Sequence, residues 1–382
     1  MKTAQLAVAS FAEAEEKINA LKAIAPQWVL VFAAPDWFKD PRFFPWLRAA
    51  FPDAQLAGCS TAGEIASNGV LTGGCVITAV QFEHCKVSVF ADTVADIDDS
   101  AAAGARLATK MQAADPGAVL LFAPGVNING TALVDGLAAG LTPGVRILGG
   151  LAGDDAAFHE TFTLTDGGIA ARAVVGVALP RELTVGNGSF GGWKPFGPDR
   201  KVTRCEGSIL YELDGEPALS VYKRYLGDHA KDLPASGLLF PFEMRDEAHR
   251  EEGLIRTILG VDEKAGSLAL AGNINPEGYL RLMRASTDAL VDGAQTSAEA
   301  SFSGLNESAS PAMAVLVSCV GRKIVMGGRV EEEVEAVGAV LGSSATLAGF
   351  YSYGEIGPTP ASQQCRLHNQ TMTISYFRED RG

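Results

Sequence analysis

Four kinds of segment follow one another in the same order three times along the chain: a short apolar run, a helical stretch, a glycine-rich stretch and a second apolar run. The first repeat opens with the apolar run 28–34 and closes with 73–82. The second opens with 118–125 and closes with 171–180, and the third opens with 312–321 and closes with 367–377. Short apolar runs of this kind are typical of buried strands. Repetition at such wide spacing indicates duplicated units and not a short-period solenoid. The pattern predicts an α/β fold of two related domains, with mixed β-sheets flanked by helices and built from duplicated β-α-β-β units.

Each glycine-rich stretch places an acid directly after a glycine. The stretches are AGCSTAGEI (57–65), LGGLAGDD (148–155) and AGFYSYGEIGP (348–358). We take the glycine-acid pairs as equivalent positions, with spacings of 90 (153 − 63) and 201 (354 − 153) residues. These pairs are Gly63 with Glu64, Gly153 with Asp154, and Gly354 with Glu355.

Two interpretations of these pairs are open. A glycine-rich turn can present several backbone N–H groups to a carboxylate or phosphate, and the adjacent acid can bind an ammonium group, which together would suit a zwitterion such as an amino acid. Alternatively, the glycines allow positive φ at tight bends and the acids cap local N–H groups. Glycine turns are far commoner than ligand sites, so the residues alone favour the second interpretation.

The chain is too long for one ordinary core, since 382 residues exceed the usual size of a single domain. We expect an N-terminal helix within residues 1–27, a first domain over 28–214 and a second over 215–382. The helix is indicated by a capping box formed by Ser10 and Glu13, followed by apolar residues at helical spacing.

Composition excludes some partners. The net charge of −14, from 31 basic and 45 acidic side chains, would repel a phosphate backbone, so we expect no nucleic-acid partner. No apolar run is long enough to span a bilayer, so membrane insertion is not expected. The six cysteines contain no C-x-x-C pair, which favours reduced thiols in the cytoplasm and offers no zinc site.

Cys59 and Ser60 are the candidate nucleophiles of a hydrolase. Four residues separate Gly58 from Gly63, so the stretch does not have the G-x-S-x-G spacing of a nucleophile elbow. The second and third stretches carry other residues in place of the thiol and hydroxyl. We therefore expect no enzyme activity, and a hydrolase using Cys59 or Ser60 stays an alternative.

Further polar residues could contact a ligand. His368 and Asn369 open an otherwise apolar strand, where they bind either a ligand or other protein groups, and His368 could also be an axial ligand of haem. Arg322 could hold a ligand carboxylate in a forked geometry, or balance the neighbouring EEEVE acids. Tyr351 and Tyr353 are the expected aromatic wall of a pocket.

Several of these stretches together resemble the FIST family, whose members carry a FIST N domain followed by a FIST C domain. The resemblance rests on GCSTAGEI, GGLAGDD, LYELDGEPAL with YLG, SCVGR, GFYSYGEIGP and LHNQTMT, in the expected order from about residue 28 to 377. It implies a bacterial intracellular sensory module that binds a small ligand, with amino acids as proposed ligands. The implied partners are histidine kinases, cyclic-dinucleotide enzymes or chemoreceptors, and one similar branch binds haem and responds to nitric oxide.

The family resemblance supplies no ligand residues, so the candidates come from the chemistry of the side chains. The leading hypothesis is a sensor that passes its signal to a separate partner, because no kinase, receiver or cyclase-like segment is recognisable. A haem-binding nitric-oxide sensor is the alternative, and no cofactor is required. The ligand-binding candidates are Cys59, Ser60, Thr61, Gly63, Glu64, Gly153, Asp154, Arg322, Tyr351, Tyr353, Gly354, Glu355, His368 and Asn369.

Overall fold

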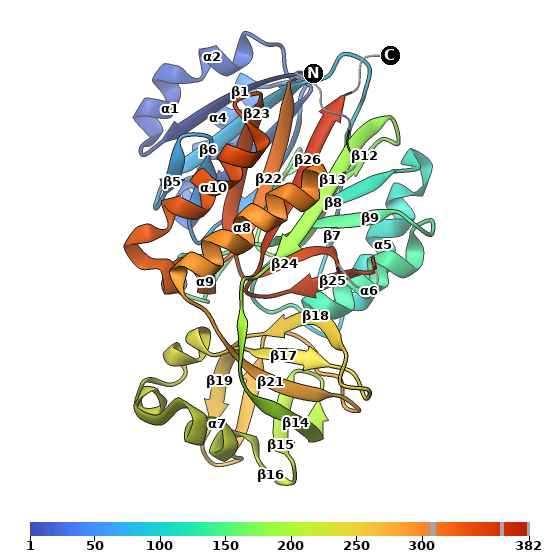
Figure 1. Cartoon of the computed structure of the whole chain (residues 1–382). Coiled ribbons are helices and arrows are strands. Elements are labelled where there is room, and N and C mark those ends of the chain that lie inside the picture. The colour runs from blue at the N-terminus through green and yellow to red at the C-terminus, as the bar shows by residue number, and fades with distance from the viewer. Residues whose placement is uncertain (304, 306–310, 360–362, 380–382) are drawn as a thin grey trace.

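The computed structural model describes residues 1–303, 305, 311–359 and 363–379. Within these residues the strands form three six-stranded sheets and one eight-stranded sheet. In Figure 1 the six-stranded sheets and their helices make up the upper body, and the eight-stranded sheet forms a smaller lower body. The predicted α/β class, with mixed sheets flanked by helices, is confirmed.

Each six-stranded sheet is built on one copy of the strand–helix–strand–strand order expected from the sequence. The first strand of each copy lies in the middle, parallel to the second strand and antiparallel to the last. The helix makes the crossover that a parallel pair requires. Unit 1 contains β2 (Trp28–Ala33), α4 (Phe43–Ala50), β3 (Gln55–Ser60) and β6 (Cys75–Gln81). Unit 2 contains β8 (Ala118–Ala123), α6 (Gly130–Gly140), β9 (Arg146–Leu151) and β12 (Ala173–Leu179). Unit 3 contains β22 (Ala312–Cys319), α10 (Glu331–Leu341), β23 (Ala345–Ser352) and β26 (Met372–Glu379).

Each unit also begins with an antiparallel edge strand that sequence analysis did not assign to it. These strands are β1 (Lys2–Val8), β7 (Ser88–Thr93) and β13 (Leu183–Phe190), which pair with β6, β12 and β26. Helices follow them: α1 (Phe11–Lys17) with α2 (Asn19–Lys22), α5 (Ser100–Met111), and α8 (Thr287–Phe302). Ser10 caps α1 by accepting from the Glu13 N–H, as the capping box predicts. The same topology therefore occurs three times, which is consistent with a duplicated unit.

A β-hairpin leaves the end of each second strand and completes the sheet of a neighbouring unit. The hairpin β4 (Glu64–Ala66) and β5 (Gly69–Leu71) of unit 1 pairs with β23 of unit 3. The hairpin β10 (Thr163–Thr165) and β11 (Gly168–Ala170) of unit 2 pairs with β3 of unit 1. The hairpin β24 (Gly354–Pro358) and β25 (Cys365–His368) of unit 3 pairs with β9 of unit 2. The exchange closes a ring of three units.

One glycine in each second strand lies against the central strand of its own sheet. A Cβ atom on Gly58, Gly149 or Gly349 would be 1.9, 2.1 or 2.0 Å from a carbonyl oxygen of β2, β8 or β22. These three glycines are therefore structurally equivalent, and each permits a backbone approach that any larger residue would prevent.

This equivalence corrects the alignment of the glycine-acid pairs. One residue after each of these glycines, the second strand pairs with a residue near the start of a hairpin strand: Phe350 with Glu64, Cys59 with Thr163, and Gly150 with Glu355. The position of the two glutamates is thus taken in unit 2 by Thr163, and not by Asp154. Residues 152–162 are an extra segment that unit 2 inserts before its hairpin.

The eight-stranded sheet, residues 194–284, is inserted in unit 3 between β13 and α8, and we call it the inserted sheet. It packs around its own apolar cluster, in which Tyr222 and Leu210 are fully buried. The expected boundary at residues 214 and 215 falls in the turn between two of its paired strands. The elements are β14 (Lys194–Glu206), β15 (Ile209–Leu213), β16 (Glu216–Pro217), α7 (Ala218–Leu226), β17 (Phe242–Arg245), β18 (Glu251–Arg256), β19 (Ile258–Asp262), β20 (Ser267–Leu270) and β21 (Tyr279–Arg284).

The remaining helices are short. α3 (Pro35–Lys39) follows β2, and α9 (Val320–Met326) follows β22. Across the described ranges, every helix falls short of the length and apolar character that crossing a membrane would require.

Because the second strands approach the central strands so closely, adding one methyl group at a glycine of a second strand should lower the stability of the protein strongly. Gly349→Ala should lower the free energy of unfolding by about 1–3 kcal/mol or more, because the new Cβ overlaps the Leu316 carbonyl. Gly328→Ala is the matched control, since a Cβ there meets no atom within 4 Å. Urea unfolding followed by circular dichroism measures both. Equal stability of the two variants would contradict the packing described here.

Candidate functional site

The three glycine-rich stretches meet at the centre of the ring. Ala62 donates its N–H to the Tyr351 carbonyl, and Tyr351 donates to the Gly63 carbonyl, both at 2.8 Å. Gly153 donates to the Ser60 carbonyl at 2.9 Å, and Tyr353 donates to the Leu151 carbonyl at 3.2 Å. The stretches are therefore hydrogen-bonded to one another and are not scattered over the surface.

A cavity of about 330 Å³ opens beside this junction, and we call it the turn cavity. Its floor is buried and comes from the end of β3, the start of β4 and the extra segment of unit 2. The floor residues are Thr61, Gly63, Glu64 and Asp154, and the residues around the mouth are Ala34, Pro35, Asp36, Lys39, Gly73, Asp155, Ala157, His159 and Glu160. Four predicted site residues thus lie together.

Glu64 lies in the floor of the turn cavity with its side chain closed off from solvent. Thr61 donates its hydroxyl to the carboxyl group, and the Gly74 N–H donates to it at 2.9 Å. Burial raises the pKa of Glu64 to about 7, although both hydrogen bonds favour the ionised form. The group therefore changes charge close to neutral pH.

Glu355 has the equivalent hydrogen bonds in unit 3, with one more from the Thr371 hydroxyl, but it does not reach the turn cavity. Ser352 donates to its carboxyl group at 2.7 Å, and the Thr371 N–H donates to it at 3.0 Å. Burial also raises the pKa of this carboxyl to about 7. Gly354 and Glu355 are completely buried.

The residue beside each glutamate differs in size between the two units. Gly73 leaves the space next to Glu64 open in unit 1, whereas Gln370 fills the corresponding space in unit 3. Gly73 and Gln370 each precede the residue whose N–H binds the glutamate, and both have positive φ, of 80° and 62°. Gly73 is exposed at the cavity mouth. Gln370 is fully buried, and its amide donates to the Leu238 carbonyl at 3.0 Å.

Asp154 organises the extra segment that forms one side of the turn cavity. Its carboxylate accepts the N–H groups of Phe158, His159 and Glu160 at 2.7–2.9 Å. The Tyr353 hydroxyl also donates to it, and the Phe158 ring stacks on the Tyr353 ring with centroids 4.2 Å apart. The local capping interpretation holds for this acid, because its oxygens are occupied by the protein.

The mouth of the turn cavity is acidic. Asp36, Asp155 and Glu160 are exposed there, in addition to the two floor acids. Lys39 lies 3.6 Å from Glu160, and Lys323 lies 3.6 Å from Asp155. The carboxylates outnumber these lysines, so a cationic group is favoured over an anionic one.

Lys323 is a neighbour of the site that sequence analysis did not select. Its amine donates to the Ala62 carbonyl at 2.7 Å and to the Thr72 hydroxyl at 3.1 Å. A Cβ on Gly63 would be 2.8 Å from that amine, so the glycine leaves room for the lysine. Its position directly after Arg322 in SCVGRKIVMGGR is the signal that could have drawn attention to it.

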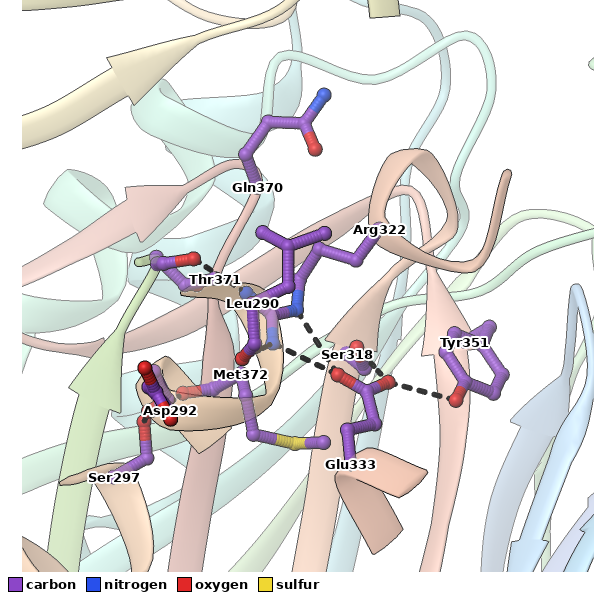
Figure 2. A network of polar contacts seen from close by, with 12 residues as sticks. Leu290, Asp292, Ser297, Ser318, Arg322, Glu333, Tyr351, Gln370, Thr371 and Met372 are labelled. Atoms are coloured by element: carbon purple, nitrogen blue, oxygen red, sulfur yellow. Dashed lines mark hydrogen bonds and ion pairs between the residues drawn. The ribbon is translucent and has the colours of Figure 1, made fainter. Parts of the chain in front are cut away.

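Arg322 and Tyr351 belong to an internal polar network and are not available to a ligand. Arg322 and Glu333 form an ion pair at 2.8 Å, and both side chains are completely buried. The Tyr351 hydroxyl and the Ser318 hydroxyl donate to the same glutamate at 2.7 and 2.9 Å, as Figure 2 shows. The guanidinium also donates to the carbonyls of Gly191 and Leu290. Arg322 thus binds an internal carboxylate in place of the expected ligand carboxylate, and its Nε and Nη2 groups both donate to one oxygen of Glu333.

His368 and Asn369 lie away from the turn cavity. His368 is 1% exposed and donates from Nε2 to the Gly357 carbonyl at 3.0 Å. Burial lowers the pKa of its imidazole to about 4, so the ring is neutral. Asn369 is equally buried, and in the described part of the chain neither its Oδ1 nor the Nδ1 of His368 has a hydrogen-bond partner.

Cys59 and Ser60 are enclosed by the junction. Cys59 is fully buried, which raises the pKa of its thiol well above the ordinary value. The Ser60 hydroxyl donates to the Gly153 carbonyl at 2.8 Å and accepts the Phe162 N–H at 2.9 Å. The Ser60 side chain therefore serves the contact between units 1 and 2, and Cys59 belongs to the apolar core. In the described ranges, no group of three or more His, Cys, Asp or Glu side chains could hold a metal ion.

The buried network predicts a large effect of a single neutralising substitution. Glu333→Gln should lower the free energy of unfolding by about 3–5 kcal/mol, because it leaves the Arg322 charge buried without its counter-ion. Asp115→Asn is the control, since Asp115 pairs with Arg181 at the surface, and it should change stability little. Thermal unfolding of both variants tests this, and a Glu333→Gln protein as stable as the control would refute the assignment.

Comparison with known proteins gives two family matches that follow one another along the chain. Residues 27–216 match the FIST N domain, and residues 218–358 match the FIST C domain. An uncharacterized protein of Mycobacterium bovis is 28% identical over 272 residues, which cover 69% of this chain and 65% of the relative. An uncharacterized protein of Mycobacterium tuberculosis is 27% identical over 245 residues, covering 62% of this chain and 61% of the relative. The matches thus span less than two thirds of these relatives.

A crystal structure of cyanuric acid hydrolase from A. caulinodans is similar over 100% of this chain and 99% of its own, with a TM-score of 0.36 and 8% identity. A likeness this weak carries no argument about either fold or activity. The two family matches cover most of the chain and agree with the resemblance noted in its sequence. The chain belongs to the FIST family, whose domains are generally ligand-binding signalling domains.

Proposed function

We propose that this protein is a sensor whose turn cavity binds a small ligand bearing an ammonium group, such as an amino acid or a related amine. The observation that carries the proposal is the convergence of acids from two units on one cavity of about 330 Å³. Such a volume suits a small metabolite. Asp36 and Asp155 would contact the ammonium group directly, and Glu64 would act from the floor below. Lys39 is the cation on the wall that would attract the carboxylate of a zwitterion.

Ligand binding would alter the surface of the protein near the cavity. The extra segment of unit 2 supplies Asp155, His159 and Glu160 to the mouth, and all three are exposed. Order in this segment depends on Asp154, which binds three of its N–H groups. A ligand held against these side chains would change what a second protein meets there. The partner classes suggested by the family are a histidine kinase, a cyclic-dinucleotide enzyme or a chemoreceptor.

We infer binding without chemical conversion. The candidate nucleophiles, Cys59 and Ser60, are buried, and the Ser60 hydroxyl is already hydrogen-bonded. A cytoplasmic location also belongs to the proposal, because all six cysteines are free, including the two that are partly exposed, Cys205 and Cys365.

A ligand screen tests the proposal. Thermal unfolding would be followed with the twenty amino acids, their decarboxylated amines and their deaminated acids. Amino acids or amines should raise the melting temperature, whereas the deaminated acids should not, because the cavity favours cations. Stabilisation by the acids alone, or by none of the compounds, would argue against the assignment.

Gly73→Gln is the sharpest variant for this screen. It introduces glutamine, the residue that fills the corresponding position in unit 3, at the mouth of the turn cavity. No atom lies within 4 Å of a Cβ at position 73, so the side chain has room. The variant should fold and lose the response to amines. Gly144→Gln is its control, since Gly144 also has positive φ and open space around it but lies away from the cavity.

The pKa of Glu64 predicts how affinity varies with pH. Because burial raises this pKa to about 7, the carboxyl is mostly ionised at pH 8 and mostly neutral at pH 6. Ammonium binding favours the ionised form, so affinity should fall about tenfold from pH 8 to pH 6. Isothermal titration calorimetry with the most stabilising amine of the screen measures this change.

Two glutamine substitutions separate the floor carboxyl from a general effect of pH. Glu64→Gln should weaken binding at pH 8 and abolish most of the pH dependence between 6 and 8. Glu355→Gln removes a carboxyl with equivalent hydrogen bonds and a similar pKa, but outside the cavity, so binding and its pH dependence should persist. Identical behaviour of the two variants would contradict a role for Glu64.

A further inference from the structure

A second cavity, of about 260 Å³, lies between unit 2 and the inserted sheet, and we call it the insert cavity. Its walls come from the start of α6, from the hairpin of unit 3 and from strands β19 and β20 with the turns beside them. Asn129 donates from Nδ2 to Asn273 Oδ1 at 3.3 Å, which joins two of these parts at the cavity wall. A molecule bound here would touch both bodies seen in Figure 1.

Much of the wall is apolar and open to solvent. Ile97 and Leu259 are 52% and 48% exposed, and they are two of the four large apolar side chains with such exposure in the described part of the chain. Leu151 and Leu367 continue the apolar surface inward. Two exposed apolar side chains facing one cavity indicate an apolar occupant.

A buried positive charge lies directly behind the opposite wall. Arg256 is 2% exposed and donates to the carbonyls of Asn273 and Leu367, at 3.0 and 3.1 Å, and both of these residues line the cavity. Within the described ranges Arg256 has no ion pair, and burial lowers the pKa of its guanidinium to about 10. A buried charge without a counter-ion is costly, and an anion in the adjacent cavity would lower that cost.

Two other charges act on Arg256. Glu252, on the same strand, favours the charged guanidinium without forming an ion pair with it, and Arg366, which is paired with Asp135 at 2.7 Å, opposes it. The N-terminal end of α6 reaches the wall at Gly130 and adds its partial positive charge. In the described part of the chain, the Asn273 Nδ2 donates to no protein acceptor, so it is a free donor on the same wall.

We propose that the insert cavity binds a small carboxylate with an apolar body, of the size of an arylacetate or a branched short-chain acid. The carboxylate lies toward Asn273, Gly130 and the charge of Arg256. The apolar body lies against Ile97 and Leu259. This site is separate from the turn cavity and has the opposite charge preference, so it does not depend on the function proposed above.

Calorimetric titration with two probe acids, phenylacetate and 4-methylpentanoate, tests the proposal. At least one should bind the full chain with a dissociation constant of about 1 mM or tighter. 2-Phenylethylamine has a similar body and the opposite charge. It is compared with the acids on Gly73→Gln protein, whose turn cavity should no longer bind amines, so that binding there does not interfere. On that chain the acid should still bind and the amine should bind at least tenfold more weakly. Failure of both acids to bind, or equal binding of the amine, would overturn the proposal.

Two substitutions locate the site, and a third controls for surface charge. Asn273→Asp replaces the free amide donor with a carboxylate, and Leu259→Asp places a carboxylate at the mouth. Each should weaken binding of the acid at least tenfold. Ile324→Asp adds the same charge at the exposed apolar residue of α9 and should leave affinity within twofold. Leu259 is exposed, so the Leu259→Asp protein should keep the wild-type melting temperature. Undiminished binding of the acid by both Asn273→Asp and Leu259→Asp would overturn the assignment.

Discussion

The exchange of β-hairpins around the central junction holds the three units together and determines where the candidate site lies. Each of the three units supplies the strands that complete a neighbour's sheet, so none has a complete sheet alone. The backbone of the three glycine-rich stretches is consequently shared between units, through hydrogen bonds such as that from Ala62 to the Tyr351 carbonyl. Glycine at the close approaches, as at Gly349, keeps the second strands against the central strands. The candidate site sits where these shared turns leave space.

Units 1 and 3 place a glutamate in related local structures at the junction. The residues around the glutamate differ, so that one lies beside a cavity and the other lies in the buried core. Glu64 and Glu355 accept equivalent hydrogen bonds, yet Gly73 leaves the first beside a cavity, whereas Gln370 fills the second place. In unit 3 the buried ion pair of Arg322 with Glu333 is also close enough for the Arg322 charge to act on Glu355. Tyr353 links the two cavities, because its side chain lines the insert cavity and its hydroxyl donates to Asp154 in the floor of the turn cavity.

Sequence patterns predicted the elements of the units well, because buried strands and crossover helices depend on local apolar runs such as 118–125. They could not predict which sheet each hairpin joins, since that pairing connects residues as distant as Glu64 and Phe350. Asp154 matched the glycine-acid pattern by its neighbours, although Thr163 holds the equivalent position, because the extra segment shifts the register. The alternative in which Arg322 balances the EEEVE acids named the right group of partners, but the burial of its pair with Glu333 could not be predicted, since an acidic run is typical of an exposed helix face.

The function proposed for the junction of units 1 and 2 is the binding of a cationic group over Glu64. A crystal structure of the protein with the most stabilising amino compound, grown near pH 8, tests it most directly. We expect density in the turn cavity with the ammonium nitrogen within about 4 Å of an Asp36 or Asp155 carboxylate oxygen. An empty turn cavity with the compound bound elsewhere, or a carboxylate of the ligand resting on the acidic floor, would contradict it.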